Sequence, residues 1–165
     1  MRRFCLLWFA FDIAAAQAAT VDIHYAPAEN LEAVDVDLLN QAGSSIDMAA
    51  YVLTDPAVIE ALGDAADRGV AVRLYLDPSE YRDPSGALAG LFAKHGVDAR
   101  IKIGGPIMHM KAYAVDRAQL RTGSGNFSRS GLSRQDNDLL VTDDAEAVGR
   151  FERDFEKIWA GGAAP

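Results

Sequence analysis

Short apolar or alternating runs recur along the chain with turn residues between them, which is the pattern of β-strands. The run Val21–Tyr25 alternates, whereas Ser45–Leu53 is largely apolar and predicts a more deeply buried strand. Further strands are expected at Val70–Leu76, Val97–Ile103, Ala112–Asp116, Gln119–Thr122 and Asp138–Thr142. Asp116-Arg117 separates two of these runs and predicts a hairpin turn.

Stretches with the helical spacing of apolar residues lie between the strands. One begins at Asp55-Pro56, where proline suits the first helical position, and ends at Gly69. The final helix, Asp143–Trp159, carries acidic residues in its first turn, which suit the helix dipole. Two shorter helices are expected at Leu31–Ala42 and Ala87–Lys94. Strands that alternate with helices predict an α/β fold, an α/β/α sandwich with a mixed, mostly parallel sheet.

The chain has 165 residues, which is enough for one domain with its own core and too short for two. We expect a single domain over residues 19–160 and a disordered tail over residues 161–165. The formal net charge of -8 argues against a nucleic-acid binder, because such proteins usually carry a basic surface. It does not exclude one, since the charge that lines a cleft matters more than the sum.

The N-terminal segment has the composition of a signal peptide. Arg2-Arg3 precedes the mostly apolar stretch Phe4–Ala16, and Ala16-Gln17-Ala18 offers small residues before a cleavage point. The apolar stretch is short for a membrane span, and Asp12 within it is unfavourable in a bilayer. We therefore expect residues 1–18 to direct export to the periplasm or the medium, with a retained N-terminal membrane anchor as the alternative.

The run His109-Met110-Lys111, followed by Asp116, carries the clearest chemistry of the chain. It places an imidazole two residues from a lysine, so that both side chains share one face of a strand. The turn Gly123-Ser124-Gly125-Asn126 follows, although its glycines would suit an ordinary turn equally well. An imidazole can form a covalent phosphoryl intermediate, and Lys111 and Asn126 can neutralise phosphate oxygens. The pattern therefore predicts attack on an anionic phosphodiester.

H-x-K-x4-D followed by G-S-x-N resembles the signature of the phospholipase D superfamily. The chain is similar above all to the single-motif members, the bacterial Nuc-type endonucleases and the mitochondrial Zucchini-type proteins, and the resemblance extends from Val21 to Trp159. It implies a phospholipase D-like domain in which His109 is the nucleophile or acid. It further implies that the phosphate is bound by Lys111, Ser124 and Asn126, and that Asp116 is structural.

The resemblance also implies a carboxylate beyond the asparagine that orients the histidine, which in this superfamily is usually a glutamate. Asp136 is the matching residue and a predicted catalytic residue, although its side chain is shorter. An aspartate can still accept a histidine N–H and raise the basicity of the ring. Asp138 competes for this role, because it alternates with Asp136 and could face the same way.

The chain has a single H-x-K run, whereas the superfamily mechanism uses two histidines. One attacks phosphorus, and the other protonates the leaving oxygen and then activates water. The simplest solution is a homodimer that brings His109 and Lys111 of both subunits together across a two-fold axis. We expect neither a cofactor nor a metal, because lysines and asparagines would neutralise the charge and no ligand cluster has suitable spacing.

Three functions are compatible with this site. The sequence favours the first, an exported, metal-independent, non-specific endonuclease that cuts DNA or RNA. The second is a phospholipase D that removes the head group of a phospholipid such as phosphatidylcholine, although the sequence offers no obvious amphipathic membrane helix. The third is a non-catalytic nucleic-acid-binding protein, against which the complete motif argues. The cleft walls decide among them, and we expect these at Pro78–Ser85 and Gly104–Ile107.

Overall fold

The computed structural model of the chain describes residues 18–79, 81 and 86–165. Residues 1–17 of the predicted signal peptide, and much of the expected cleft wall Pro78–Ser85, lie outside this part of the chain. Within it, none of the helices combines the length and the apolar composition that crossing a membrane requires.

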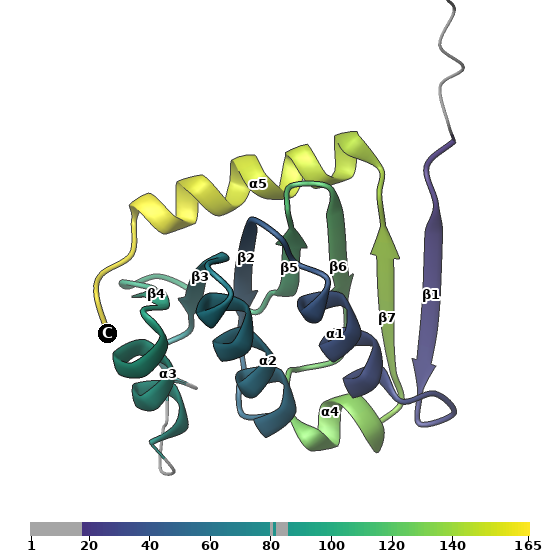
Figure 1. Cartoon of the computed structure of the whole chain (residues 1–165), viewed down its shortest axis with the longest axis horizontal. Helices are drawn as coiled ribbons and strands as arrows, with labels where there is room; N and C mark the ends of the chain where they lie inside the picture. Colours follow the sequence, from purple (N-terminus) through teal and green to yellow (C-terminus); the bar gives the residue numbers. More distant parts are fainter. Residues whose placement is uncertain (1–17, 80, 82–85) are drawn as a thin grey trace, which may run out of the picture.

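Seven strands of the described chain form one sheet in the order β1-β7-β6-β5-β2-β3-β4 (Figure 1). Their bounds are β1 (Val21–Ala26), β2 (Ser45–Ala50), β3 (Ala71–Leu76), β4 (Asp98–Ile101), β5 (Lys111–Val115), β6 (Gln119–Gly123) and β7 (Asn137–Thr142). Each strand starts within one residue, and ends within three residues, of a strand expected from the apolar pattern.

Helices lie on both faces of this sheet (Figure 1). The helices α1 (Leu31–Asn40), α2 (Pro56–Asp67) and α3 (Ala87–His95) cover one face, and α5 (Ala145–Ala160) crosses the other. A short α4 (Arg129–Ser133) follows β6. The start of α2 is fixed as the sequence predicts, since the Asp55 carboxylate accepts from Ala57 N–H over 3.0 Å and from Val58 N–H over 3.3 Å.

The α/β class and the mixed sheet agree with the prediction, but the sheet is not mostly parallel. Only the β2–β3 and β3–β4 neighbours are parallel, and the other pairs in the described sheet are antiparallel. Parallel neighbours need a crossover, which α2 and α3 supply. β5 and β6 are instead joined by Asp116-Arg117, both with φ of 54°, as a tight hairpin turn requires. The prediction of a mostly parallel sheet is wrong because β5 is antiparallel to both of its neighbours, β2 and β6, and β7 is antiparallel to both β1 and β6.

Two apolar layers hold the domain together, one on each face of the sheet. The larger packs α1, α2 and α3 on the sheet and includes Leu31, Leu62 and Leu74, which are fully buried. The smaller packs α5 through Val148, Phe151 and Phe155. Burial of one such side chain contributes about 1.5–3 kcal/mol, so α5 is held by its apolar stripe.

The end of the chain is ordered, in contrast to the disordered tail predicted over residues 161–165. Ala163 exchanges two backbone hydrogen bonds with Ile101 of β4, at 2.7 and 3.0 Å. Gly162 passes close to the sheet, because a Cβ there would lie 2.8 Å from the Tyr75 ring. The prediction rested on composition alone, which does not show that an unpaired strand edge lies within reach.

Candidate active site

The predicted site residues gather at one end of the sheet. β5 starts at Lys111 and β6 ends at Gly123, and the hairpin register pairs Tyr113 with Arg121. The H-x-K run and the G-S-x-N turn therefore leave neighbouring strands at the same end. β2 ends beside them, because Ala50 pairs with Lys111.

Tyr51, which follows β2, lies against both His109 and Lys111. The exposed His109 ring has its centroid 4.4 Å from that of Tyr51, with 56° between the ring planes. The ammonium group of Lys111 lies 4.9 Å from the Tyr51 ring and donates to the His109 carbonyl over 2.7 Å. Burial lowers the pKa of Lys111. Sequence reasoning missed Tyr51, whose one signal was its place at the end of a strand that leads to the site.

Ser124 is held by the start of β7. Its hydroxyl donates to Oδ1 of Asn137 over 3.0 Å and accepts from the N–H of Asp138 over 3.0 Å. The Asn137 amide donates in turn to the carbonyl of Gly131 over 2.9 Å. These bonds fix the Ser124 side chain at the end of β6, next to the start of α4.

Asp136 is exposed. Among the described residues of one subunit no hydrogen bond or ion pair joins its side chain to His109, so its role in orienting the histidine stays a prediction. Successive strand side chains point to opposite faces, so Asp138 also points away from the face on which Asn137 meets Ser124. The side chain that faces the turn is thus Asn137, which sequence reasoning passed over because it is not a carboxylate.

Asn126 is held rigidly and has an unused buried atom. Its Oδ1 is buried and accepts no hydrogen bond from the residues that the structure describes. Its backbone packs so tightly on α4 that a Cβ at Gly131 would lie 2.5 Å from the Asn126 carbonyl oxygen. The next carbonyl, that of Phe127, accepts from Thr54 N–H over 2.8 Å and from Asp55 N–H over 3.0 Å. The unpaired Oδ1 is an acceptor, whereas binding of a phosphate oxygen needs a donor, which is the NH2 group of the same amide.

Asp116 has a structural position, as the resemblance implies. Its carboxylate accepts from the N–H groups of Gly43, Ser44 and Ser45, at 2.9, 2.7 and 2.9 Å, and from the Ser44 hydroxyl. Partial burial alone would raise the pKa of Asp116, but these hydrogen bonds lower it to about 2. The residue thus joins the β5–β6 hairpin to the start of β2, at the end of the sheet remote from His109.

A buried ion pair lies beneath the H-x-K run. The Arg121 guanidinium donates to both carboxylate oxygens of Asp35, at 2.7 and 2.9 Å, and neither residue is exposed. It also donates to the Lys111 carbonyl over 2.9 Å and lies 4.5 Å from the Phe127 ring. One guanidinium therefore contacts both the strand that carries Lys111 and the residue after Asn126.

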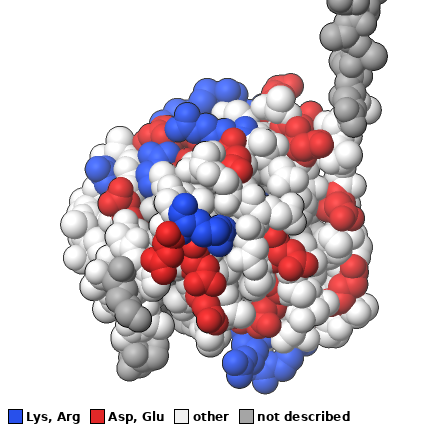
Figure 2. Space-filling view, in the orientation of Figure 1, with Lys and Arg blue, Asp and Glu red and all other residues white. Residues whose placement is uncertain are grey.

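Charge is unevenly distributed over the molecule. Acidic side chains spread over the face that α1, α2 and α3 cover, whereas Lys and Arg lie at its upper margin, in one patch near its centre and near α4 (Figure 2). Arg129 and Arg134, in and after α4, are exposed. The site end therefore has some positive charge, while the helical face offers none of the basic surface of a nucleic-acid binder.

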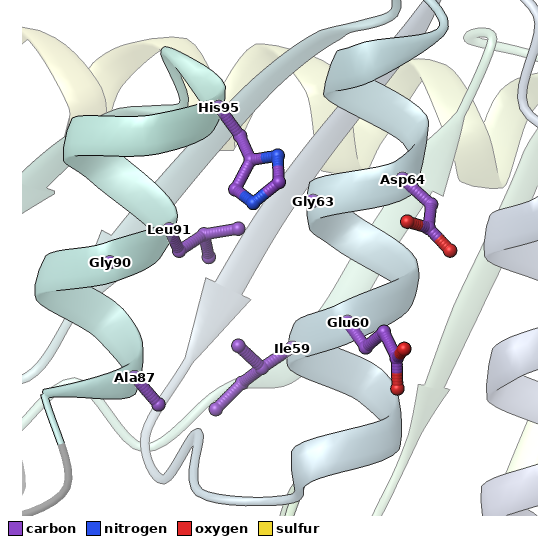
Figure 3. A pocket seen from close by; sticks show the side chains of 8 residues that line it. All are labelled: Ile59, Glu60, Gly63, Asp64, Ala87, Gly90, Leu91 and His95. Atoms are coloured by element: carbon purple, nitrogen blue, oxygen red, sulfur yellow. The ribbon is translucent and has the colours of Figure 1, made fainter.

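A groove of about 360 Å³ between α2 and α3 is separate from this site (Figure 3). His95 lies over Gly63 there, and its Nδ1 is 2.8 Å from a carboxylate oxygen of Asp67. None of the predicted site residues lines the groove, whose walls are formed by Ile59, Glu60, Gly63, Asp64, Ala87, Gly90, Leu91 and His95. It therefore offers neither an unpaired nucleophile nor a phosphate ligand.

Comparison with known proteins identifies the family to which the chain belongs. A model of the family described as "Cardiolipin synthase, PLD-like domain" matches residues 36–159. The human mitochondrial cardiolipin hydrolase is 32% identical over 118 residues, which are 72% of this chain and 46% of that protein. A phospholipase D of Rickettsia bellii is 30% identical over 144 residues, or 86% of this chain and 70% of that protein. The chain spans about half the length of the mitochondrial cardiolipin hydrolases that it matches.

Solved structures give the same result for the fold. Nuc from Salmonella typhimurium, a phospholipase D family member, superposes with a TM-score of 0.82 and 25% identity, over 90% of this chain and 99% of that one. NucT from Helicobacter pylori superposes with a TM-score of 0.81 and 21% identity, over 90% of this chain and 100% of that one. The family match covers well over half of the chain and includes every residue of the H-x-K run and the G-S-x-N turn. The chain therefore belongs to the phospholipase D superfamily, as a PLD-like domain.

Proposed function

We propose that the protein is a metal-independent phosphodiesterase that works through a phosphohistidine intermediate. The observation that supports this most directly is the placement of His109, Lys111, Ser124 and Asn126 at one end of the sheet. His109 is exposed, as a nucleophile must be, while Lys111 is 6% exposed and close beside it.

The proposed reaction has two steps. A ring nitrogen of His109 attacks phosphorus, and the bond to the leaving oxygen breaks as a second histidine gives that oxygen a proton. Water then attacks the phosphohistidine, the second histidine takes its proton, and His109 is released. Lys111 and the Asn126 amide stabilise the charge that gathers on the non-bridging oxygens.

The second histidine comes from a second subunit in this proposal. The described part of the chain holds two other histidines, and both have carboxylate partners. His24 lies 2.8 Å from Glu29, and His95 lies 2.8 Å from Asp67. A two-fold dimer that places two copies of His109 across one phosphate supplies nucleophile and acid from a single motif.

For the substrate we propose a phospholipid, and the nucleic acid that the sequence favours becomes the second candidate. The observation that favours a lipid is the uncharged, exposed run that leads into His109, where Ile103 is 66% and Ile107 58% exposed. The observation that favours a nucleic acid is the likeness to Nuc over 99% of that chain. We further propose that the protein acts after export, on the basis of its N-terminal composition.

Hydrolysis of bis-p-nitrophenyl phosphate in the presence of a chelator tests the chemistry without choosing a substrate class. We expect full activity in chelator, none in His109→Ala, and a labelled protein from the wild type when a radioactive phosphodiester is quenched in alkali. Activity that returns only on addition of a divalent ion would contradict the metal-free reaction. An active monomer in sedimentation would contradict the shared site.

A further inference from the structure

We propose that the segment Ile103–Ile107, here called the apolar loop, docks the protein on the surface of a phospholipid bilayer. The proposal rests on the phosphodiesterase function above and adds how a bilayer substrate reaches the site. The loop crosses from β4 to the strand that carries Lys111, and it reaches His109 two residues after its end.

The apolar loop projects into solvent. Ile103 is 66% exposed and Ile107 is 58% exposed, so more than half of the surface of each of these two aliphatic residues is open to solvent. Gly104 and Gly105 have φ of 59° and 72°, and a Cβ at either would meet no atom within 4 Å. Side chains of this kind are normally buried, and an exposed group of them marks a contact surface.

The flanks of the loop are fixed, so its exposure is not fraying. The N–H of Lys102 donates to the Leu76 carbonyl over 3.0 Å. On the other side, the N–H of Met108 donates to the Asp77 carboxylate over 2.6 Å, and the Met110 carbonyl accepts from Tyr51 N–H over 2.8 Å. The tip is therefore held outward from a rigid base that also holds His109.

The charge pattern fits a bilayer. The eight residues 103–110 contain no Lys, Arg, Asp or Glu in a chain that is 24% charged, and Lys102 and Lys111 bound the run. An apolar tip with Lys102 at its base places aliphatic groups among acyl chains and a cation at the level of lipid phosphates, whereas Lys111 is buried in the site. Because the apolar loop itself carries no charge, the surface that we propose for it is a zwitterionic one, such as phosphatidylcholine.

A third exposed side chain supports the same orientation. Tyr25, at the end of β1, is 58% exposed and pairs with Asp138, whose N–H donates to Ser124. It therefore lies at the same end of the sheet as His109, on the side opposite β4. A tyrosine suits the interface between lipid and water, so both flanks of the site present interfacial side chains.

The loop is too small to be a stable protein interface by itself. Such interfaces bury roughly 800 Å² on each partner, far more than two isoleucines and a proline provide. A nucleic acid would meet no cation between residues 103 and 108. Interfacial docking needs only a few inserted side chains, because the membrane supplies the apolar phase.

The double variant Ile103→Ser/Ile107→Ser of the full chain tests the proposal, with Val21→Ser/Ile23→Ser as its matched control. Val21 and Ile23 are also exposed, at 60% and 45%, but they lie toward the other end of β1. We expect the loop variant to bind phosphatidylcholine vesicles about tenfold more weakly in pelleting, and to hydrolyse them about tenfold more slowly. Partial insertion of two isoleucine side chains into a bilayer is enough to account for a factor of this size. Its hydrolysis of soluble bis-p-nitrophenyl phosphate should fall by much less than its hydrolysis of vesicles, because a small soluble diester reaches the site without docking on a bilayer.

Three results would overturn the proposal. An equal loss of vesicle binding in the control variant would show that exposed apolar side chains bind vesicles wherever they lie. Dissociation of a dimer in sedimentation of the loop variant would show that the loop is a subunit contact. A loss of single-stranded DNA cleavage in the loop variant would make it a nucleic-acid contact. Failure of the proposed phosphodiesterase function would give a different result, because the wild type would then not hydrolyse bis-p-nitrophenyl phosphate. Pelleting with vesicles does not depend on hydrolysis and would still test docking.

Discussion

Replacing Arg121 by methionine removes a cation on which two parts of the site depend. Its guanidinium contacts Asp35, the Lys111 carbonyl and the Phe127 ring, and Asp35 is fully buried. In Arg121→Met the Asp35 carboxylate keeps only the Tyr113 hydroxyl, at 2.9 Å. Breaking a buried pair in this way costs about 3–5 kcal/mol.

Urea unfolding followed by circular dichroism measures that loss. The whole domain is stable by roughly 5–15 kcal/mol. With about 2 kcal/mol per molar urea, the midpoint should fall by about 2 M. The double variant Asp35→Leu/Arg121→Met should recover much of this loss, because it leaves no charge buried alone. A single variant that loses less than about 1 kcal/mol would refute the reasoning.

Activity distinguishes positioning from stability. Arg73→Met is the matched control, since Arg73 pairs with the buried Asp47 on the opposite face of the sheet and touches no site residue. We expect kcat on bis-p-nitrophenyl phosphate to fall about tenfold in Arg121→Met, because a small displacement of the Lys111 strand weakens transition-state contacts. Arg73→Met should lose stability but keep kcat per folded molecule. Equal kcat losses in the two variants would leave Arg121 with a structural role only.

Asp116→Ala should lower the free energy of unfolding in urea by about 1–3 kcal/mol, because it leaves N–H groups at the start of β2 without an acceptor. An unchanged free energy of unfolding would contradict a structural role for Asp116. Burial, and next the charge of Asp47, raises the pKa of Glu152 from 4.5 to about 7. The folded state therefore binds a proton that the unfolded state releases, so the free energy of unfolding should fall as the pH rises from 4.5 to about 7. Urea unfolding of Glu152→Gln at several pH values should not show this fall. Asn137→Ala should lower kcat on bis-p-nitrophenyl phosphate more than Asp136→Asn does. A larger loss in Asp136→Asn would support Asp136 as the carboxylate that orients His109.

Much of the fold was predictable because local signals and tertiary structure agree. Asp55-Pro56 starts α2 by its own capping chemistry, and Asp116-Arg117 forms the hairpin turn that its place between two apolar runs predicts. Strand direction was predictable only for β5 and β6, because a hairpin makes its two strands antiparallel. The periodicity of a strand is the same whichever way its neighbour runs, so the pattern did not show that β5 is antiparallel to β2 or that β7 is antiparallel to β6.

The site was predictable only where a motif carries it. His109, Lys111 and the G-S-x-N turn meet because one hairpin joins them. Tyr51, Asn137 and the Asp35–Arg121 pair come from other parts of the chain, and their roles arise from contacts across the sheet. A buried Asp or Arg looks like any solvated charge in a sequence, because its partner is set by tertiary packing.

The hydrogen bonds between Ala163 and Ile101 also bear on how the protein behaves in concentrated solution. β4 ends one side of the sheet and is only four residues long, so its free edge is a template on which another chain could add a strand. The final residues of the chain occupy part of that edge. A version shortened to Ala160 would expose it, and we expect such a protein to aggregate more readily than the full chain.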